Sequence, residues 1–551
     1  MRSESALIID GYIDEPACFG VPPYISPHVR YCAGVLLEHG FDPHYLTIDQ
    51  IRSSPGLMHE HAGAGLVLVI SGVTVPGKYM GGRPASFEEL SLIAASFKRP
   101  ETIIGGPVSF GYSEGGGTLA RMPLFSGYDI ILKGSVPDAL DRHLSGLDPV
   151  GTLDYGKIDR WSSLGAPIIR MHPRYPEVMI EMETATGCTR WVTGGCSFCT
   201  ESFYGSPVYR TVEGVSEEIH ALHEEGARHF RLGRQPDLLS YGSVSVDEEF
   251  PVPVPEMIES LFSSIRAAAP GLRTLHIDNI NPGMIAAHEE ESRVALEVIV
   301  RYHTPGDVAA FGMESADPRV VKANNLKAMP DQVFRAIGIV NEVGGIREGG
   351  IPHLLPGLNF ISGLAGETDE TFELNRCFLE HVIKSGLLVR RVNIRKLMAF
   401  EGTPAFHEHK IGVHDAGFRR FKEWVRKEFD RPMLKQVFPA GTVLEDVIIE
   451  EEGTISFGRQ LGSYPIKVGI PSRFPFGSKT DVVVVDYGMR SLTALNFPVR
   501  INRLTVSDLK WLNGIGKKQY AKILSQIPYK SVEDFFRISG CTLSGSVFTT
   551  D

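Results

Sequence analysis

Short apolar runs that alternate with helical stretches constrain the fold of this chain more than any other feature. In the first 160 residues the runs lie at 6–9, 66–70, 102–104 and 130–132. Buried strands separated by helices form parallel, doubly wound sheets, which bind ligands beyond the carboxyl ends of their strands. We therefore expect an α/β protein whose first domain, residues 1–160, has a ligand-facing edge at Gly11, Gly72 and Gly105.

The same alternation resumes in the middle of the chain. Six candidate strands lie at 177–183, 229–232, 274–278, 309–313, 357–361 and 389–395. Repeated strand–helix units predict a full or partial (β/α) barrel over residues 176–430, with its site at the carboxyl ends of the strands. Residues 161–175 are predicted to be a linker between the two domains.

The pattern changes again after the barrel. Residues 410–436 are basic and helical, and short apolar runs follow at 447–449, 466–468 and 482–485. Short strands separated by Gly, Pro and Ser predict a small β-barrel over residues 437–500. Residues 501–551 return to a helical pattern.

Composition excludes several classes of protein. The chain has 551 residues, 43% of them hydrophobic and 22% charged, which is typical of a soluble protein with several domains. The formal net charge is −11, so any contact with nucleic acid must use a local basic face. No apolar run is long enough to span a membrane and the start lacks a signal-peptide core, so we expect a cytoplasmic protein.

Three of the seven cysteines lie within one short segment. Cys188, Cys196 and Cys199 have the spacing C-x7-C-x2-C on a Gly-rich loop that directly follows a predicted strand. Thiolates are soft ligands that favour iron–sulfur clusters or zinc, and three can ligate a [4Fe–4S] cluster whose fourth iron stays open. Two alternatives are a structural zinc site, which would need a fourth ligand from elsewhere, and three buried thiols.

This cysteine loop resembles that of the radical S-adenosylmethionine (SAM) superfamily, whose usual pattern is C-x3-C-x-aromatic-C. Phe198 occupies the aromatic position, and the longer first gap is similar to that of Elongator-type tRNA-modifying members. The resemblance implies that the cysteines hold a [4Fe–4S] cluster and that SAM is cleaved reductively to a 5′-deoxyadenosyl radical, which abstracts hydrogen from a substrate. It also implies a low-potential electron donor as a partner.

Two further segments resemble SAM-binding motifs of the superfamily. Glu314 and Ser315 end a predicted strand in the manner of the G-x-E-S motif near the ribose and methionine. The segment 357–368 looks like the glycine-rich strand and turn that pack on the adenine. This likeness implies Asn359, Gly363 and Glu367 as SAM-binding residues.

One motif departs from the family pattern. Where members carry a Gly-Gly-Glu motif that grips the methionine amino group, this chain has Gly233, Arg234 and Gln235. The family carboxylate is absent at this position. Gly233 and Gln235 are therefore the candidate cofactor-binding residues, and Asp237 is an alternative partner for the amino group.

Residues 1–160 resemble the cobalamin-binding-like domain that precedes many radical SAM barrels. The resemblance rests on the turns at 71–74, 104–107 and 128–134. The D-x-H-x-x-G motif, whose His ligates cobalt, is absent, and the nearest match, Asp42-Pro43-His44, has Thr47 where the motif has Gly. Some relatives bind cobalamin without that His and others have lost the cofactor, so cobalamin stays open.

The other cysteines give no second cluster. Methylthiotransferases carry three N-terminal cysteines for one, whereas this region has two, Cys18 and Cys32. We expect both to be buried apolar side chains. Cys377 lies in an apolar helical pattern and is expected in the core as well.

Residues 437–500 resemble a TRAM domain, a small barrel that binds RNA in several tRNA-modifying enzymes. Arg459, Lys467 and Lys479 are its candidate phosphate contacts. A generic β-barrel is the alternative interpretation.

Residues 501–551 resemble a helix-hairpin-helix. Gly514 and Gly516 would permit its tight turn, and Lys517 and Lys518 would add charge beside amide groups that face a phosphate. A purely structural hairpin is the alternative.

The domain order resembles that of a largely archaeal family of radical SAM proteins with a C-terminal helix-hairpin-helix. The resemblance implies an enzyme that acts on RNA, with tRNA as the favoured substrate. Two alternatives stay open. One is a cobalamin-dependent radical SAM methyltransferase that acts on a small molecule or protein. The other is a nucleic-acid-binding protein with a structural cluster.

Overall fold

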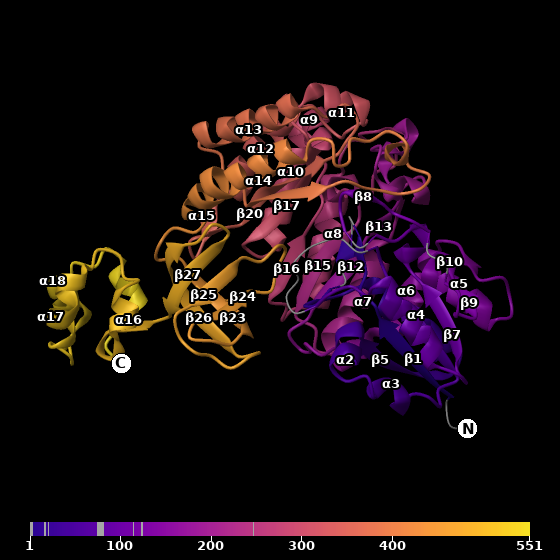
Figure 1. Cartoon of the computed structure of the whole chain (residues 1–551), viewed down its shortest axis with the longest axis horizontal. Coiled ribbons are helices and arrows are strands. Elements are labelled where there is room, and N and C mark those ends of the chain that lie inside the picture. The colour runs from indigo at the N-terminus through magenta and orange to yellow at the C-terminus, as the bar shows by residue number, and fades with distance from the viewer. Residues whose placement is uncertain are drawn as a thin grey trace.

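The computed structural model describes residues 4–15, 18–19, 21–73, 82–113, 115–122, 125–245 and 247–551. An N-terminal sheet is followed by a parallel barrel, a small β-barrel and a helical module, and the two chain ends lie at opposite ends of the molecule (Figure 1). None of the helices in the described ranges is long and apolar enough to cross a membrane.

The N-terminal domain is built on a parallel sheet. Across the sheet the strands are β5 (Phe41–Thr47), β1 (Glu4–Asp10), β6 (Leu66–Ile70), β7 (Glu101–Gly105) and β9 (Ile130–Ile131). The strands expected at 6–9, 66–70, 102–104 and 130–132 are confirmed, and β5 is an additional edge strand. The order changes direction beside β1, which is the arrangement of a doubly wound fold.

Glycines bring the loops at the carboxyl edge of this sheet close together. Gly106 has a φ of 115°, and a Cβ there would lie 2.3 Å from the carbonyl oxygen of Ser71. Only glycine allows the loop after β7 to lie on the loop after β6 in this way. Thr74, the last residue of the expected turn at 71–74, lies outside the described residues.

The expected partial barrel forms from six parallel strands, each at its expected place. They are β12 (Met179–Glu183), β15 (His229–Arg234), β16 (Thr274–Ile277), β17 (Asp307–Glu314), β20 (Leu354–Ser362) and β21 (Arg391–Lys396). They pair as β12-β15-β16 and β17-β20-β21, and the short β4 (Tyr24–Ile25) extends the sheet beside β12. A hydrogen bond of 2.8 Å from the Ala310 amide to the Asp278 carbonyl joins the two halves.

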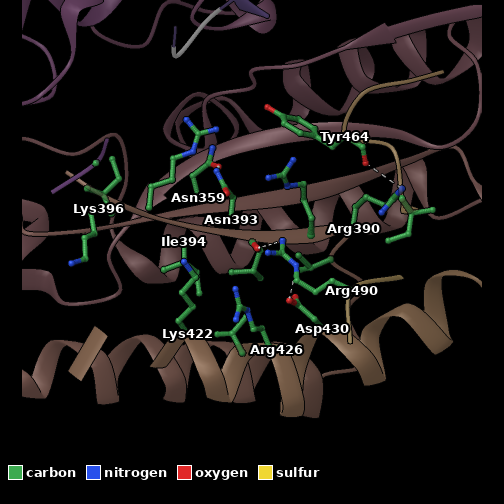
Figure 2. A pocket seen from close by; sticks show the side chains of 18 of the residues that line it. Asn359, Arg390, Asn393, Ile394, Lys396, Lys422, Arg426, Asp430, Tyr464 and Arg490 are labelled. Carbon is green, nitrogen blue, oxygen red and sulfur yellow. Dashed lines mark hydrogen bonds and ion pairs between the residues drawn. The ribbon is translucent and has the colours of Figure 1, made fainter. Parts of the chain in front are cut away.

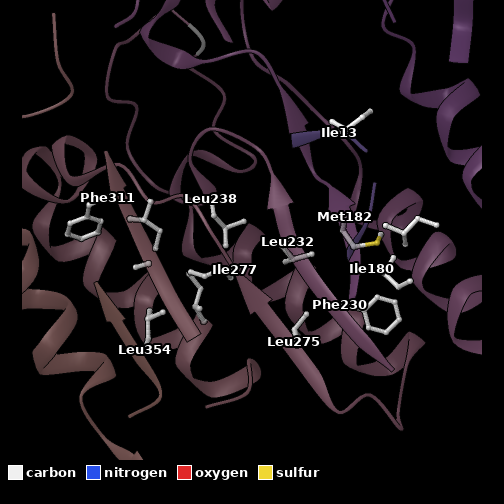
Figure 3. Packing of buried hydrophobic residues seen from close by; sticks show 14 of the residues in the cluster. Ile13, Ile180, Met182, Phe230, Leu232, Leu238, Leu275, Ile277, Phe311 and Leu354 are labelled. Carbon is white, nitrogen blue, oxygen red and sulfur yellow. The ribbon is translucent and has the colours of Figure 1, made fainter. Parts of the chain in front are cut away.

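Alternation along the first strands separates an apolar outer layer from a polar lumen. Ile180, Phe230 and Leu275 face the surrounding helices and are fully buried (Figure 3). Their neighbours Glu181 and Arg231 are also fully buried but point inward, where their charges pair with each other. A single hydrophobic cluster continues from the N-terminal sheet through this barrel into the small β-barrel.

The predicted linker at 161–175 is wrong. Helix α6 (Tyr155–Leu164) and the 3₁₀ helix η2 (Ala166–Met171) occupy most of it. Trp161 is fully buried, and a Cβ at Gly34 would lie 2.0 Å from its carbonyl oxygen. The apolar residues of segment 161–175 thus pack against helix α1 (Pro27–Glu38), and this segment belongs to the interface between the domains.

A buried charge network fastens the first two domains together. Arg30 of α1 donates a hydrogen bond of 2.6 Å to Glu218 of helix α7 (Val212–Glu224). Arg210 donates to the other Glu218 oxygen at 2.5 Å and to Asp159 of α6 at 2.6 Å. Arg30, Arg210 and Glu218 have no exposed side-chain surface.

The basic stretch after the barrel is a long helix with a widened centre. It comprises α14 (Asp415–Trp424), a π-helical segment η7 (Val425–Asp430) and α15 (Arg431–Val437). It leads into the expected small β-barrel, a closed barrel of strands β23 (Val443–Glu451), β24 (Ser456–Arg459), β25 (Lys467–Ile470), β27 (Ser491–Asn496) and β26 (Lys479–Tyr487), in that order around the barrel.

The C-terminal module consists of short helices with their own core. These are α16 (Val506–Leu509), α17 (Tyr520–Leu524) and α18 (Val532–Ser539). Leu509, Ile523 and Phe535 are fully buried in a cluster that includes Val483 and Val485 of β26. The module therefore packs against the outside of the small β-barrel.

Replacing Glu218 by Gln is expected to lower the free energy of unfolding by about 3–5 kcal/mol, because two buried guanidinium groups lose their shared carboxylate. Urea denaturation followed by circular dichroism measures the change. Glu217→Gln, an exposed neighbour on the same helix, is the matched control and should change the stability by less than about 0.5 kcal/mol. Equal effects of the two substitutions would contradict a stabilising role of the network.

The effect of Glu218→Gln should depend on pH. Burial alone raises the pKa of Glu218, but the guanidinium groups of Arg30 and Arg210 outweigh burial and hold the pKa below its usual range. Such a carboxylate stabilises the fold above its unfolded-state pKa of about 4.3, and the contribution is lost as the pH falls further. The stability difference should be full at neutral pH and shrink in acid, and a constant difference would contradict the prediction.

Candidate functional site

The long gap between the first two cysteines folds back on itself. The residues between Cys188 and Cys196 form the 3₁₀ turn η3 (Thr189–Thr193), and the Gly195 amide donates to the Arg190 carbonyl at 2.9 Å. Gly195 has a φ of 70°, which glycine adopts without strain. Cys188, Cys196 and Cys199 therefore line one cavity of about 70 Å³ despite the long gap.

Arg190 braces this loop from inside. Its Nη1 lies 3.0 Å from the Cys196 Sγ and 2.7 Å from the Asn325 carbonyl oxygen. Its Nε donates to Glu249 at 2.7 Å. One guanidinium thus ties the inserted turn to two other segments and to a cysteine sulfur.

The far end of the loop is held by strand β15. Arg234, the last residue of that strand, donates to Glu201 at 2.9 Å. Its guanidinium also lies 5.2 Å from the ring of Tyr204. The residue that replaces the expected second glycine of the Gly-Gly-Glu motif therefore positions the segment that follows Cys199.

The cysteine donor set fits an iron–sulfur cluster. Burial, only partly offset by the Lys327 ammonium, raises the pKa of the Cys188 thiol to about 11, and burial also raises the pKa of Cys199. Cluster binding displaces these protons. Among the described residues no three His, Cys, Asp or Glu side chains converge closely enough to hold a single metal ion.

Lys327 is a functional candidate that sequence reasoning missed. It lines the cysteine cavity and forms no hydrogen bond or ion pair with any residue in the described ranges. Burial lowers its pKa, but the nearby Cys196 and Cys188 outweigh burial, so the pKa is raised and the side chain is an ammonium. No sequence signal distinguishes this lysine from the surface lysines around it.

Unsatisfied acceptors surround this ammonium and the cysteine cavity. Among the buried oxygens without a hydrogen-bond partner in the described part of the chain are Oε2 of Glu201, which lines the cavity, and Oε1 of Gln235, next to the lining residue Pro236. Oδ2 of Asp237 and Oε2 of Glu314 are two more. Burial raises the pKa of Asp237 to about 6 and that of Glu314 to about 7, and Lys327 opposes both shifts. An ammonium beside free acceptors is suited to a zwitterionic amino-acid group, whose carboxylate and amino group need opposite partners.

The predicted SAM-binding residues divide into two groups. The side-chain nitrogen of Gln235 donates to the Leu232 carbonyl, and its side-chain oxygen has no hydrogen-bond partner. Glu314 and Asn359 line a large cavity beside the cysteine cavity. Gly233 faces the lumen, where a Cβ would lie 2.0 Å from a Glu181 oxygen.

The remaining three residues are used within their own loops. The Ser315 hydroxyl accepts a hydrogen bond from the Asp317 amide at 3.1 Å. Glu367 accepts from the Gly363 amide at 2.9 Å and from the Ser362 hydroxyl at 3.1 Å. Gly363 and Glu367 thus close the turn after β20, and neither lines the two cavities.

The large cavity has a volume of about 1170 Å³. It extends along β21 between the barrel, the helix at 415–437 and the small β-barrel (Figure 2). Asn279 lines both cavities, and Phe198 and Thr200 of the cysteine loop line the large one. The large cavity therefore opens onto the cysteine site.

The N-terminal domain covers the cysteine loop. Its strand β8 (Thr118–Leu119) pairs with β22 (Met398–Ala399), which follows β21. Phe110 lies 5.5 Å from the rings of both Phe203 and Tyr204, which end the cysteine loop. This contact packs the N-terminal domain against the end of the cysteine loop.

The nearest match to the cobalt-binding motif lies away from this edge. Asp42, Pro43 and His44 are part of strand β5, at the opposite side of the sheet from β9. The His44 ring lies 5.0 Å from His61. The segment is a strand and not a loop at the ligand-facing edge, so it does not supply a cofactor ligand there.

The expected nucleic-acid residues lie in the C-terminal module. Gly514 has a φ of 88° and packs against Gly540, as the expected tight turn requires. The Gly516 amide donates to the Gln519 side chain at 2.7 Å, so this amide is already used. Lys517 and Lys518 are exposed.

The phosphate contacts expected on the small β-barrel diverge. Arg459 and Lys467 line the large cavity. Lys479 instead forms an ion pair with Glu177.

The cysteines outside the loop confirm one expectation and correct another. Cys32 is fully buried, as expected. Cys377 is exposed, so its placement in the core was wrong. It lies five residues from the buried Phe372, about 140° around the helix. The side chain of Cys18 lies outside the described residues.

A solved structure with a similar fold is that of the radical S-adenosylmethionine methyltransferase TsrM from Kitasatospora setae, with cobalamin and a [4Fe-4S] cluster bound. The alignment covers 73% of this chain and 77% of that chain, with a TM-score of 0.50 and 15% sequence identity. The chain therefore has the fold of a radical SAM enzyme.

Two archaeal proteins are close in sequence. The chain is 40% identical to an uncharacterized protein of Archaeoglobus fulgidus over 522 residues, which cover 94% of this chain and 95% of the relative. It is 42% identical to an uncharacterized protein of Methanocaldococcus jannaschii over 505 residues, which cover 89% of this chain and 92% of the relative. The chain belongs to the family of these two proteins.

A more distant relative carries a function in its description. The ribosomal protein uS12 methylthiotransferase RimO of a Thermotoga species is 24% identical over 370 residues, which cover 62% of this chain and 76% of RimO. No protein-family model matches the chain.

We predict that anaerobically reconstituted protein binds about four iron atoms per chain. Cys188→Ala, Cys196→Ala and Cys199→Ala should each lose most of this iron and the visible absorption, because each removes a thiolate from the same cavity. Cys377→Ala is the matched control, since this cysteine is exposed and lies outside the loop. Iron analysis and absorption spectra measure the outcome, and iron retained by the loop variants would exclude the loop as the site.

Proposed function

We propose that this protein is a radical SAM enzyme that holds a [4Fe–4S] cluster on Cys188, Cys196 and Cys199 and modifies RNA. The observation that carries the proposal is that the three thiols line one cavity together with Lys327 and with Glu201, whose Oε2 has no hydrogen-bond partner. The radical SAM fold of the chain is independent support.

When bound, the cluster supplies the electron that cleaves SAM to methionine and a 5′-deoxyadenosyl radical. The chain's own residues orient the ligand and exclude water. Lys327 binds the SAM carboxylate, and Gln235, Asp237 and Glu314 provide acceptors for its amino and ribose groups. Phe110 and the strand pair β8–β22 cover the site, so that a reactive species is not quenched by solvent.

RNA is the favoured substrate class, with tRNA as the first candidate. The small β-barrel and the helical module carry the residues that resemble TRAM and helix-hairpin-helix modules, including the exposed Lys517 and Lys518. The likeness to RimO, whose substrate is a ribosomal protein, adds translation components as a related class. A further partner in this proposal is a low-potential electron donor, which reduces the cluster.

A cobalamin-dependent methyltransferase is the second candidate function. The similarity to TsrM, whose structure contains cobalamin, favours it. The protein would then bind cobalamin at the carboxyl edge of that sheet, beside Gly106 and Ser71. Absorption spectra of protein produced with added cobalamin separate this candidate from the first.

The first test is SAM cleavage. Reconstituted wild-type protein with SAM and a strong reductant should produce 5′-deoxyadenosine, and a variant with all three loop cysteines changed to Ala should produce none. Cys377→Ala should match the wild type. Chromatography of the nucleosides measures the product, and a cluster-containing protein that does not bind SAM would overturn the enzymatic proposal in favour of a structural cluster.

The role of Lys327 has a test that does not depend on turnover. Lys327→Met should weaken SAM binding about tenfold or more, because a charge-assisted contact with the carboxylate is lost. Equilibrium dialysis under anaerobic conditions measures the dissociation constant, and the absorption spectrum checks that the cluster is intact. Lys322→Met, at an exposed position on the preceding helix α11 (Pro318–Ala323), is the control. Unchanged SAM affinity of Lys327→Met would exclude the assignment.

A further inference from the structure

We infer that the large cavity along β21 is the substrate channel and that it binds the phosphate backbone of a single-stranded RNA segment. The inference rests on the proposed function and assigns the substrate to a defined set of side chains. The C-terminal module is then an auxiliary contact and not the main RNA site.

The charge of the cavity wall is opposite to that of the protein. Among the described residues that line the cavity, nine are Lys or Arg and two are Glu or Asp. The whole chain has a net charge of −11. A cavity lined by one sign of charge concentrates ligands of the other sign, so this one attracts anions.

Most of these cations are free of carboxylate partners. Four of the nine form ion pairs with nearby acids, among them Lys396 with Asp415 and Arg490 with Asp430. The other five form none with any carboxylate that the structure describes: Arg390, Arg391, Arg395, Lys422 and Arg426. Burial lowers the pKa of Arg390 and Arg391 to about 10, so both are still charged near neutral pH. Arg390 is the buried member of the five, and a buried cation without an acidic partner is costly unless an anion binds it.

The helix at 415–437 carries two of these cations, Lys422 in α14 and Arg426 in the π-helical segment η7, and both line the cavity. Figure 2 shows Lys422 and Arg426 on the side of the helix that faces the strands, with Arg490 beside Asp430 of the same helix. The segment η7 begins at Val425, one turn after Lys422. π-helical turns are rare and occur often at functional sites.

The cations lie at both exposed and buried positions along the cavity, as binding of several successive phosphates requires. Arg426 and Arg490 are exposed, whereas Arg390 is buried. The positive charge of Arg395 acts to lower the pKa of Glu314, which the proposed function places at the SAM site. One phosphate group carries about two negative charges, fewer than this wall can neutralise. The cations therefore mark a path from the surface to the cofactor cavity.

Aromatic side chains line the same path. Six of the described lining residues are Tyr or Phe; Phe400, Phe418 and Phe429 are buried, and Tyr24, Phe198 and Tyr464 are partly exposed. The Arg391 guanidinium lies 4.0 Å from the ring of Tyr464. Single-stranded nucleic acids bind grooves that combine cations for phosphates with flat groups for stacked bases. This combination favours an unpaired RNA segment over a small phosphorylated metabolite.

The test compares neighbouring positions on one helix. Reconstituted full-length protein is titrated into a short fluorescein-labelled single-stranded RNA at several KCl concentrations, and anisotropy gives the affinity. The double variant Lys422→Gln/Arg426→Gln should bind about tenfold more weakly or worse. Its salt slope should fall by about 0.7 for each lost phosphate contact. Lys427→Gln removes an adjacent exposed charge that pairs with Glu423 outside the cavity and should bind like the wild type.

Two outcomes would overturn the inference. The first is unchanged RNA affinity in Lys422→Gln/Arg426→Gln, with the loss confined to Lys517→Gln/Lys518→Gln, which would make the C-terminal module the main site. The second is binding of tripolyphosphate but not RNA, which would make the ligand a small anion. Failure of the proposed function is a separate result, because it appears as absence of 5′-deoxyadenosine from wild-type protein and leaves RNA binding unaffected.

Discussion

The arrangement of the domains depends on one buried guanidinium in the lumen of the central barrel. Arg231 forms ion pairs with both Glu181 and Asp278, and none of the three has exposed side-chain surface. Tyr24 and Tyr464 place their rings 5.8 and 5.7 Å from its centre. Removing these charges from water is costly, so the group is stable only where both carboxylates and the surrounding dipoles are in place.

This network connects the N-terminal and C-terminal parts of the chain through the barrel. Tyr24 belongs to β4 and donates to the Gly462 carbonyl at 2.6 Å, while Ser463 donates to the Ile277 carbonyl at 2.7 Å. Residues 462–464 of the small β-barrel thus contact polar groups in the lumen of the central barrel. The position of the small β-barrel determines where Arg459, Lys467 and Arg490 meet β21, and therefore shapes the cationic cavity.

Sequence reasoning succeeded where the pattern was local. The strands around Glu181, Arg231 and His276 alternate between apolar and polar residues, and the cysteine spacing is visible directly. Sequence reasoning failed where contacts between distant segments determine the structure. Strand β5 contains Pro43 between Asp42 and His44, which interrupt its apolar pattern, yet it pairs along the edge of a parallel sheet. Lys327 reaches the cysteine cavity only because Asn324 and Asn325 hold its loop against Ser197 and Arg190.

Two features differ from the usual radical SAM motifs: the long gap between Cys188 and Cys196, and Arg234 and Gln235 at the end of β15. Both differences involve the cysteine loop. Arg190 braces the insertion between Cys188 and Cys196, and Arg234 at the strand end holds the segment beyond Cys199 by pairing with Glu201. Because Arg234 binds one oxygen of Glu201, the other oxygen is left free in the cysteine cavity. Under the proposed function, the acceptor that the strand lacks is thus provided by the loop.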